Sequence, residues 1–385
     1  MAAATALAIG VWFKAPDFAG SAAVAAPTVK LPQVPANGEM GFVVSRFGPA
    51  VVEGDKTACP QGPGFTLRES YLDSLPSAER ARLSLPANEP ELTKRWQALA
   101  FGPNGTNICS QPDMFDRPVI KRTVQSRRAV GMNLDGDSGD GSGNAESCTH
   151  ENFTSPSGER GIDNQAYRVL GCSYLGPDGT AGEVTRGYSQ FLASGEWTQL
   201  ILVRGVDSLE HDEDVEVIYA NTPDRPPVDS KGNFIPGASF TVSNTLPRYR
   251  NVLRGRIDHG VITTEPNDIK LTQTWGQGGA RDIRGNRTKF DLRRARLRLS
   301  IQADGSLKGV VGGYQPAWEL IQSPSLGGVG AALVAGVDCA ARLKTLKMYA
   351  DGIRDPKTGQ CTGVSNAYDL AAVPAMVNDV PEARR

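Results

Sequence analysis

The sequence lacks the motifs that would assign it to several biochemical classes. None of its six cysteines forms a C-x-x-C pair, so zinc ribbons, thioredoxin-type chemistry and c-type haem attachment lack their ligands. No G-x-S-x-G, P-loop or strand-linked G-x-G-x-x-G motif is present to indicate a hydrolase, an NTPase or a dinucleotide-binding protein. The formal net charge is -1, without the basic excess of a nucleic-acid-binding domain, so nucleic acid is excluded as a partner.

Long apolar runs are also missing beyond the N-terminus, which argues against a transmembrane helix. The 43 Gly and 26 Pro show no repeat period, so the composition excludes a fibre and favours many turns and short strands. A chain of 385 residues has room for two or three domains, or for one large β domain with additions.

The N-terminus resembles an export signal. Residues 2–13 are apolar, and Ala23-Val-Ala25 fits a small-residue cleavage site, which predicts a signal-like segment over 1–26. No Lys or Arg precedes the apolar run, and Lys14 and Asp17 interrupt the approach to the cleavage site. The alternatives are a disordered Ala-rich tail and a membrane-tethering segment.

The even number of well-spaced cysteines agrees with export, because disulfides form in oxidising compartments. We therefore predict a periplasmic, cell-surface or extracellular protein, the alternative being six free thiols in a cytosolic one. Sequential pairing is expected, since each bridge would then close a loop within one apparent structural unit. The predicted pairs are Cys59–Cys109, Cys148–Cys172 and Cys339–Cys361.

The pattern along the chain predicts four segments: the signal-like 1–26, a loop-rich and part-helical 27–120, a β-rich 121–320 and a helical, disulfide-containing 321–385. Short helices are expected at 77–83 and 89–100, a strand at 41–47, and a helix at 330–350 on which the 365–377 tail docks. Strands are expected at 196–204, 214–219, 238–243, 250–257, 260–264, 268–275, 289–301 and 307–312. Consecutive strands without helices between them predict a mainly β protein with an antiparallel β-sandwich or jelly-roll-like core and helical N- and C-terminal additions.

An acidic, Gly-rich loop at residues 132–151 is the strongest candidate for a site. Asp135, Asp137 and Glu146 have a partial EF-hand spacing, but Gly139 and Asp140 depart from that pattern at its fifth and sixth positions. We expect a non-helical calcium loop. Its predicted ligands are Asp135, Asp137, Asp140, Glu146, Asp163 and Asn164. The alternatives are a solvated acidic loop without an ion and a transition-metal site at His150 and Glu151.

A second candidate is a ligand surface on the predicted sheet. Arg296 and Arg298 share one strand face, which is either an outer sheet face with cross-strand partners or an anion-binding surface. Tyr314 and Trp318 lie at the end of the last strand and supply either core packing or an aromatic platform for a sugar.

No set of catalytic residues is identified, so a binding role is favoured over an enzymatic one. The function expected is an exported, disulfide-bonded, calcium-binding module of the cell envelope, with a glycan or another envelope protein as its partner. Two alternatives stay open: a carbohydrate-active hydrolase or lyase on a concanavalin-like sandwich, and an accessory subunit of an envelope complex.

Overall fold

The computed structural model describes residues 30–62, 66–175, 179–242, 250–273, 288–321 and 336–379. The predicted signal-like segment 1–26 and the first part of the predicted helix 330–350 lie outside the described residues. Residues 31–379 belong to one compact unit as far as they are described. Among the described helices, none has the length and apolarity needed to cross a membrane.

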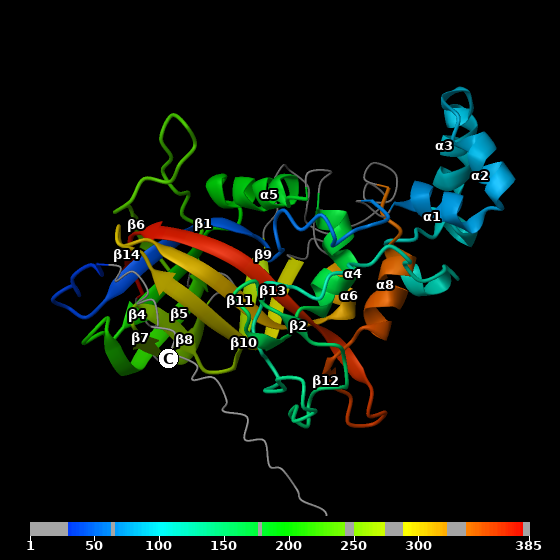
Figure 1. Cartoon of the computed structure of the whole chain (residues 1–385). Coiled ribbons are helices and arrows are strands. Elements are labelled where there is room, and N and C mark those ends of the chain that lie inside the picture. Colours follow the sequence, from blue (N-terminus) through cyan, green and yellow to red (C-terminus); the bar gives the residue numbers. More distant parts are fainter. Residues whose placement is uncertain are drawn as a thin grey trace, which may run out of the picture. The chain divides into compact units, whose positions relative to one another are not determined.

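Eight antiparallel strands of the described residues close into a β-barrel (Figure 1). Their order around the barrel is β1-β4-β5-β7-β8-β10-β11-β13, and β13 pairs with β1 to complete the circle. The strands are β1 (Met40–Pro49), β4 (Gln199–Arg204), β5 (His211–Asn221), β7 (Arg250–Asp258), β8 (Val261–Thr264), β10 (Thr288–Ile301), β11 (Leu307–Pro316) and β13 (Cys361–Pro374).

The prediction of a sandwich or jelly roll is therefore wrong. Seven of the eight barrel strands overlap ranges predicted as strands, the exception being β13, but the alternation of apolar and polar residues is the same in a sandwich and in a barrel. The closing pair comes from segments at opposite ends of the chain: Phe42 lies opposite Pro374 and Pro49 opposite Tyr368. Pairing β1 with β13 leaves neither strand as an unpaired sheet edge, which removes a site for aggregation. Most of the tail at 365–377 thus forms a barrel strand.

Side chains fill the barrel, as expected for eight strands. Phe47 is fully buried: its ring stacks on Tyr368 at 4.8 Å between centroids and meets Trp197 edge-on at 5.1 Å. Phe290 completes the group at 5.9 Å from Phe47. The interior is therefore a packed core rather than a channel.

The remaining strands are short additions to the barrel. β9 (Asn267–Gln273) pairs with the first half of β10, and β12 (Gly352–Arg354) pairs with the start of β13. Two small sheets are formed by β2 (Phe153–Thr154) with β3 (Arg160–Ile162), and by β6 (Ser239–Thr241) with β14 (Met376–Asn378).

The helices include both predicted short helices, which are confirmed as α2 (Ser77–Leu83) and α3 (Glu89–Ala98). With α1 (Leu67–Ser74) they pack around Leu72, Leu83 and Leu92. The others are α4 (Gln165–Tyr174), α5 (Gly182–Ala193), α6 (Ala317–Ile321) and α8 (Cys339–Met348), with 3-10 turns η1 (Pro86–Asn88), η2 (Pro103–Gly105) and η3 (Pro112–Met114). The sequence did not predict α4 or α5.

All six cysteines are in disulfides, which is consistent with an exported protein, but the predicted sequential pairing is wrong. The bonds are Cys59–Cys172, Cys109–Cys339 and Cys148–Cys361. Each joins distant segments, with sequence separations of 113, 230 and 213 residues. The expectation failed because proximity in sequence was taken for proximity in space.

Candidate metal centre

The acidic loop lies on the outer face of β10 and β11, where arginines of the barrel hold its backbone. Arg296 donates to the carbonyl of Asn133 at 3.2 Å, and Arg298 donates to the carbonyl of Gly131 at 2.9 Å. Arg298 also pairs with Glu159 at 2.8 Å. The two arginines therefore anchor the loop, and these contacts occupy donors that were candidates for binding an external anion.

Apolar contacts beneath the loop complete this attachment. Met132 and Leu134 pack on Tyr314 of β11, and all three are buried. A side chain at Gly312 would come within 3.0 Å of Met132 Cε, so this glycine makes room for the loop. Tyr314 is consequently a covered residue rather than part of an exposed aromatic platform.

Asp163 is brought to the loop by the β2–β3 hairpin. Its N–H donates to the carbonyl of Met132 at 3.0 Å, and its Oδ2 accepts from the N–H of Leu134 at 2.6 Å. The Asp163 side chain is fully buried, and its Oδ1 points toward His150. One carboxylate oxygen is thus fixed by backbone, while the other faces the centre of the site.

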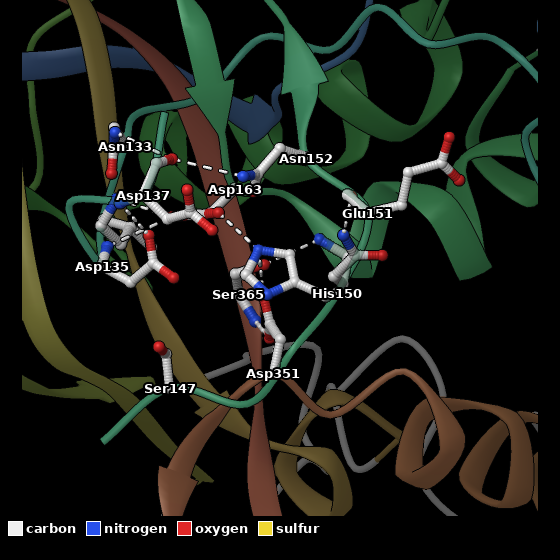
Figure 2. A network of polar contacts seen from close by, with 12 residues as sticks. Asn133, Asp135, Asp137, Ser147, His150, Glu151, Asn152, Asp163, Asp351 and Ser365 are labelled. Carbon is white, nitrogen blue, oxygen red and sulfur yellow. Dashed lines mark hydrogen bonds and ion pairs between the residues drawn. The ribbon is translucent and has the colours of Figure 1, made fainter. Parts of the chain in front are cut away.

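His150 lies between two buried carboxylates (Figure 2). Its Nε2 is 2.8 Å from Asp163 Oδ1 and 3.8 Å from Asp351 Oδ2. Its Nδ1 is 2.8 Å from the carbonyl oxygen of Cys148. A carbonyl only accepts, so Nδ1 carries a proton, and it is Nε2 that faces the carboxylates.

Asp351 enters the site from the turn between α8 and β12. Its Oδ1 accepts from the N–H of Ser365 at 2.6 Å, and its backbone carbonyl accepts from the N–H of Cys148 at 2.8 Å. Its Oδ2 is buried and has no hydrogen-bond partner among the described residues. The imidazole of His150 lies 3.8 Å from this oxygen, so a protonated His150 supplies positive charge beside it without a direct hydrogen bond.

Asp135 is the third carboxylate of the group. Its Oδ1 accepts from the N–H of Asp137 at 2.8 Å. A metal-ligating atom of each of Asp135, His150 and Asp163 lies within 4.8 Å of the other two. Asp135 is 7% exposed and the side chains of Asp163 and His150 are 0% and 8% exposed, so the three residues are largely buried.

The pKa shifts follow from this crowding of acids around one imidazole. Burial alone would lower the pKa of His150, but the hydrogen bond to Asp163 and the charge of Asp351 raise it to about 10. Burial raises the pKa of Asp351 to about 7, and it raises the pKa of Asp163 as well. Burial and the charges of Asp163 and Asp351 also raise the pKa of Tyr314, whose hydroxyl has no hydrogen-bond partner among the described residues.

Three carboxyl groups therefore lie around one imidazole, and burial disfavours the ionised forms of Asp163 and Asp351. A divalent cation would replace the proton at Nε2 and neutralise the remaining carboxylates. Metal-binding histidines commonly donate their other N–H to a backbone carbonyl, as Nδ1 of His150 does.

Of the six ligands predicted from the sequence, Asp135 and Asp163 meet in this cluster. Asp137 uses its Oδ1 to accept three N–H groups of its own turn, from Gly139, Asp140 and Gly141. Those backbone bonds lower the pKa of Asp137. The structure does not bring Asp137, Asp140, Glu146 or Asn164 into the cluster.

Asp140 and Glu146 are exposed, and Glu146 is not joined to the cluster by any contact among the described residues. Asn164 is buried and caps α4 by accepting from the N–H of Tyr167 at 3.1 Å. Trp318, a predicted ligand-surface residue, is 37% exposed on α6, and Tyr314 is 1% exposed. Trp318 and Tyr314 therefore do not form a shared exposed surface.

Sequence reasoning missed Asp351 altogether and paired His150 with Glu151 as a transition-metal site. Glu151 is 61% exposed and lies beside Arg168 and Arg127 instead. The signal for Asp351 was its nearness to Cys361, whose bond to Cys148 brings the two segments together. That signal becomes usable only when the disulfide pairing is known.

Comparison with known proteins does not assign a function, so functional inference rests on the geometry of the site. The chain matches no protein-family model, no curated protein and no solved structure.

Proposed function

We propose that the chain is an exported, metal-binding protein of the cell envelope with a binding or structural role. In this proposal a divalent ion held by Asp135, His150 and Asp163 joins the acidic loop to the segment that follows the β2–β3 hairpin, and Asp351 adds a further carboxylate. The observation that carries the proposal is the orientation of His150, whose protonated Nδ1 is satisfied by Cys148 while Nε2 faces the acids.

One imidazole with carboxylates suits zinc or manganese, whereas calcium prefers oxygen ligands alone. We therefore propose a transition-metal ion first and calcium, the ion expected from the sequence, as the second candidate. Burial of Asp163 and Asp351 favours a structural ion over a catalytic one, because a catalytic ion keeps an open coordination position. A glycan or another envelope protein is the proposed partner.

The test uses the full chain with its disulfides intact, first treated with a chelator and then dialysed. Thermal unfolding is measured with no metal and with zinc, manganese or calcium. An ion present at a hundred times its dissociation constant should stabilise the fold by about 2.7 kcal/mol. Elemental analysis of the untreated protein identifies the resident ion. An unchanged melting temperature with all three ions, together with no ion in the untreated protein, would contradict the proposal.

A further inference from the structure

A small pocket beside the metal centre contains a buried guanidinium with an unused donor. The pocket has a volume of about 330 Å³, within the usual range of small-molecule sites. His150, Glu151, Gln165 and Arg168 line it together with threonines, while Val124, Met348, Tyr349 and Ala350 supply an apolar wall. The pocket thus combines a charged side with an apolar side.

Arg168 is held rigidly at this pocket. Its Nη1 donates to the carbonyls of Val124 at 2.6 Å and Ser126 at 3.0 Å, and its guanidinium stacks on the ring of Phe153 at 4.2 Å. The side chain is only 8% exposed. Arg168 is therefore positioned before any ligand arrives, which lowers the entropy cost of binding.

The Nη2 atom of Arg168 has no hydrogen-bond partner among the described residues. The nearest carboxylate oxygen is Glu151 Oε2 at 3.6 Å, beyond hydrogen-bond distance, and the Glu151 side chain is 61% exposed. Burying an N–H without an acceptor is energetically unfavourable. Glu151 therefore does not accept a hydrogen bond from Nη2 of Arg168, and a ligand in the pocket could supply that acceptor.

We propose that this pocket binds a small organic oxyanion, a carboxylate or a phosphate monoester, with a short apolar group. The oxyanion accepts from Nη2 of Arg168 and displaces Glu151 toward solvent, while the apolar group lies on Met348 and Tyr349. Planar guanidinium groups suit such anions better than lysine does. Anion binding in this pocket requires no metal ion at the neighbouring cluster.

Isothermal titration of the chelator-treated full chain tests this proposal with four probes: acetate, benzoate, inorganic phosphate and phenyl phosphate. We expect saturable binding in which benzoate exceeds acetate, or phenyl phosphate exceeds phosphate, and the stronger pair identifies the headgroup. Glu151→Gln should tighten binding about threefold or more, because it removes the competing negative charge. Arg168→Lys should weaken binding by about tenfold or more.

Arg127→Ala is the matched control. Arg127 also pairs with Glu151 at 3.6 Å, but its side chain is 86% exposed and it does not line the pocket. Its removal should change affinity by less than about twofold. The proposal is overturned if no probe binds wild type or Glu151→Gln, or if Arg127→Ala weakens binding as much as Arg168→Lys. The Glu151→Gln arm keeps the test decisive should Arg168→Lys fail to fold, because unchanged affinity there also overturns it.

Discussion

The Nε2 atom of His150 lies 2.8 Å from Asp163 Oδ1 and 3.8 Å from Asp351 Oδ2, although the two aspartates come from opposite halves of the chain. His150 therefore links the acidic loop, the β2–β3 hairpin and the turn before β12.

Replacing His150 with Gln should remove the nitrogen ligand and lower zinc affinity by more than about tenfold, which corresponds to 1.4 kcal/mol or more. Titration calorimetry of the chelator-treated protein measures this affinity. His259→Gln is the matched control, because His259 is 80% exposed at a turn and lies outside the cluster. Equal zinc affinity in wild type and His150→Gln would exclude His150 as a ligand.

Asp351→Asn should act in opposite directions with and without metal. In chelator it should stabilise the fold by about 1–3 kcal/mol, because it removes a buried charge whose Oδ2 has no hydrogen-bond partner among the described residues. The Asn carbonyl retains the bond from Ser365. Zinc should stabilise this variant by less than it stabilises wild type. Urea unfolding under the two conditions measures both effects, and destabilisation in chelator would refute the argument.

Removing the Cys148–Cys361 disulfide should reduce both stability and metal affinity. Cys148 supplies the carbonyl that orients His150, and the bond connects it to the start of β13. A Cys148→Ser/Cys361→Ser double variant should lose about 2–5 kcal/mol of stability. Cys109→Ser/Cys339→Ser serves as the control, since it removes a bond away from the cluster and should lower stability while leaving zinc affinity unchanged. Equal zinc affinity in the two double variants would contradict the role given to Cys148.

Asp379 should contribute stability that depends on pH. It accepts from Arg250 at 2.8 Å and from Arg204 at 3.0 Å, and its side chain is 1% exposed. Burial would raise the pKa of Asp379, but the bonds and charges of Arg250 and Arg204 lower it below the usual value. Because the folded pKa is depressed, this stability is complete above the unfolded pKa, near 4, and is lost as pH falls through the folded pKa.

Asp379→Asn should therefore destabilise the protein by about 1.5–3 kcal/mol at pH 7, and by progressively less as the pH falls from about 4 through the depressed folded pKa. Urea unfolding across this pH range checks the difference. Asp214→Asn is the control, because the pair of Asp214 with Arg254 is three-quarters exposed and should contribute little. A destabilisation by Asp379→Asn that does not change with pH would disprove the ion-pair explanation.

Phe47→Ala should cost about 3–5 kcal/mol, because it opens a cavity among Trp197, Phe290 and Tyr368 in the barrel core. Phe101→Ala is the matched control, since that ring is 46% exposed and its removal should cost less than about 1 kcal/mol. Chemical denaturation measures both. Similar losses in the two variants would show that the barrel interior is not the main core.

Only some residues of the candidate site could be predicted from the sequence. Asp135 and Asp163 were identifiable because acidic residues in a Gly-rich loop are typical cation ligands. Asp351 was not, because its nearness to Cys361 becomes informative only when Cys361 is known to bond to Cys148. His150 was paired with Glu151 for their adjacency, yet the Glu151 side chain is 61% exposed and lies beside Arg127 and Arg168 rather than the carboxylates.

The sequence by itself determined the strands and their buried faces, because alternation such as Val215, Val217 and Tyr219 is a local property of the extended chain. It also determined the even cysteine count that agrees with export. Only the tertiary structure decided which strands and cysteines pair. Closing β1 on β13 and Cys148 on Cys361 depends on contacts between distant segments, whose free energy is set by the packing of the whole barrel rather than by the residues around each partner.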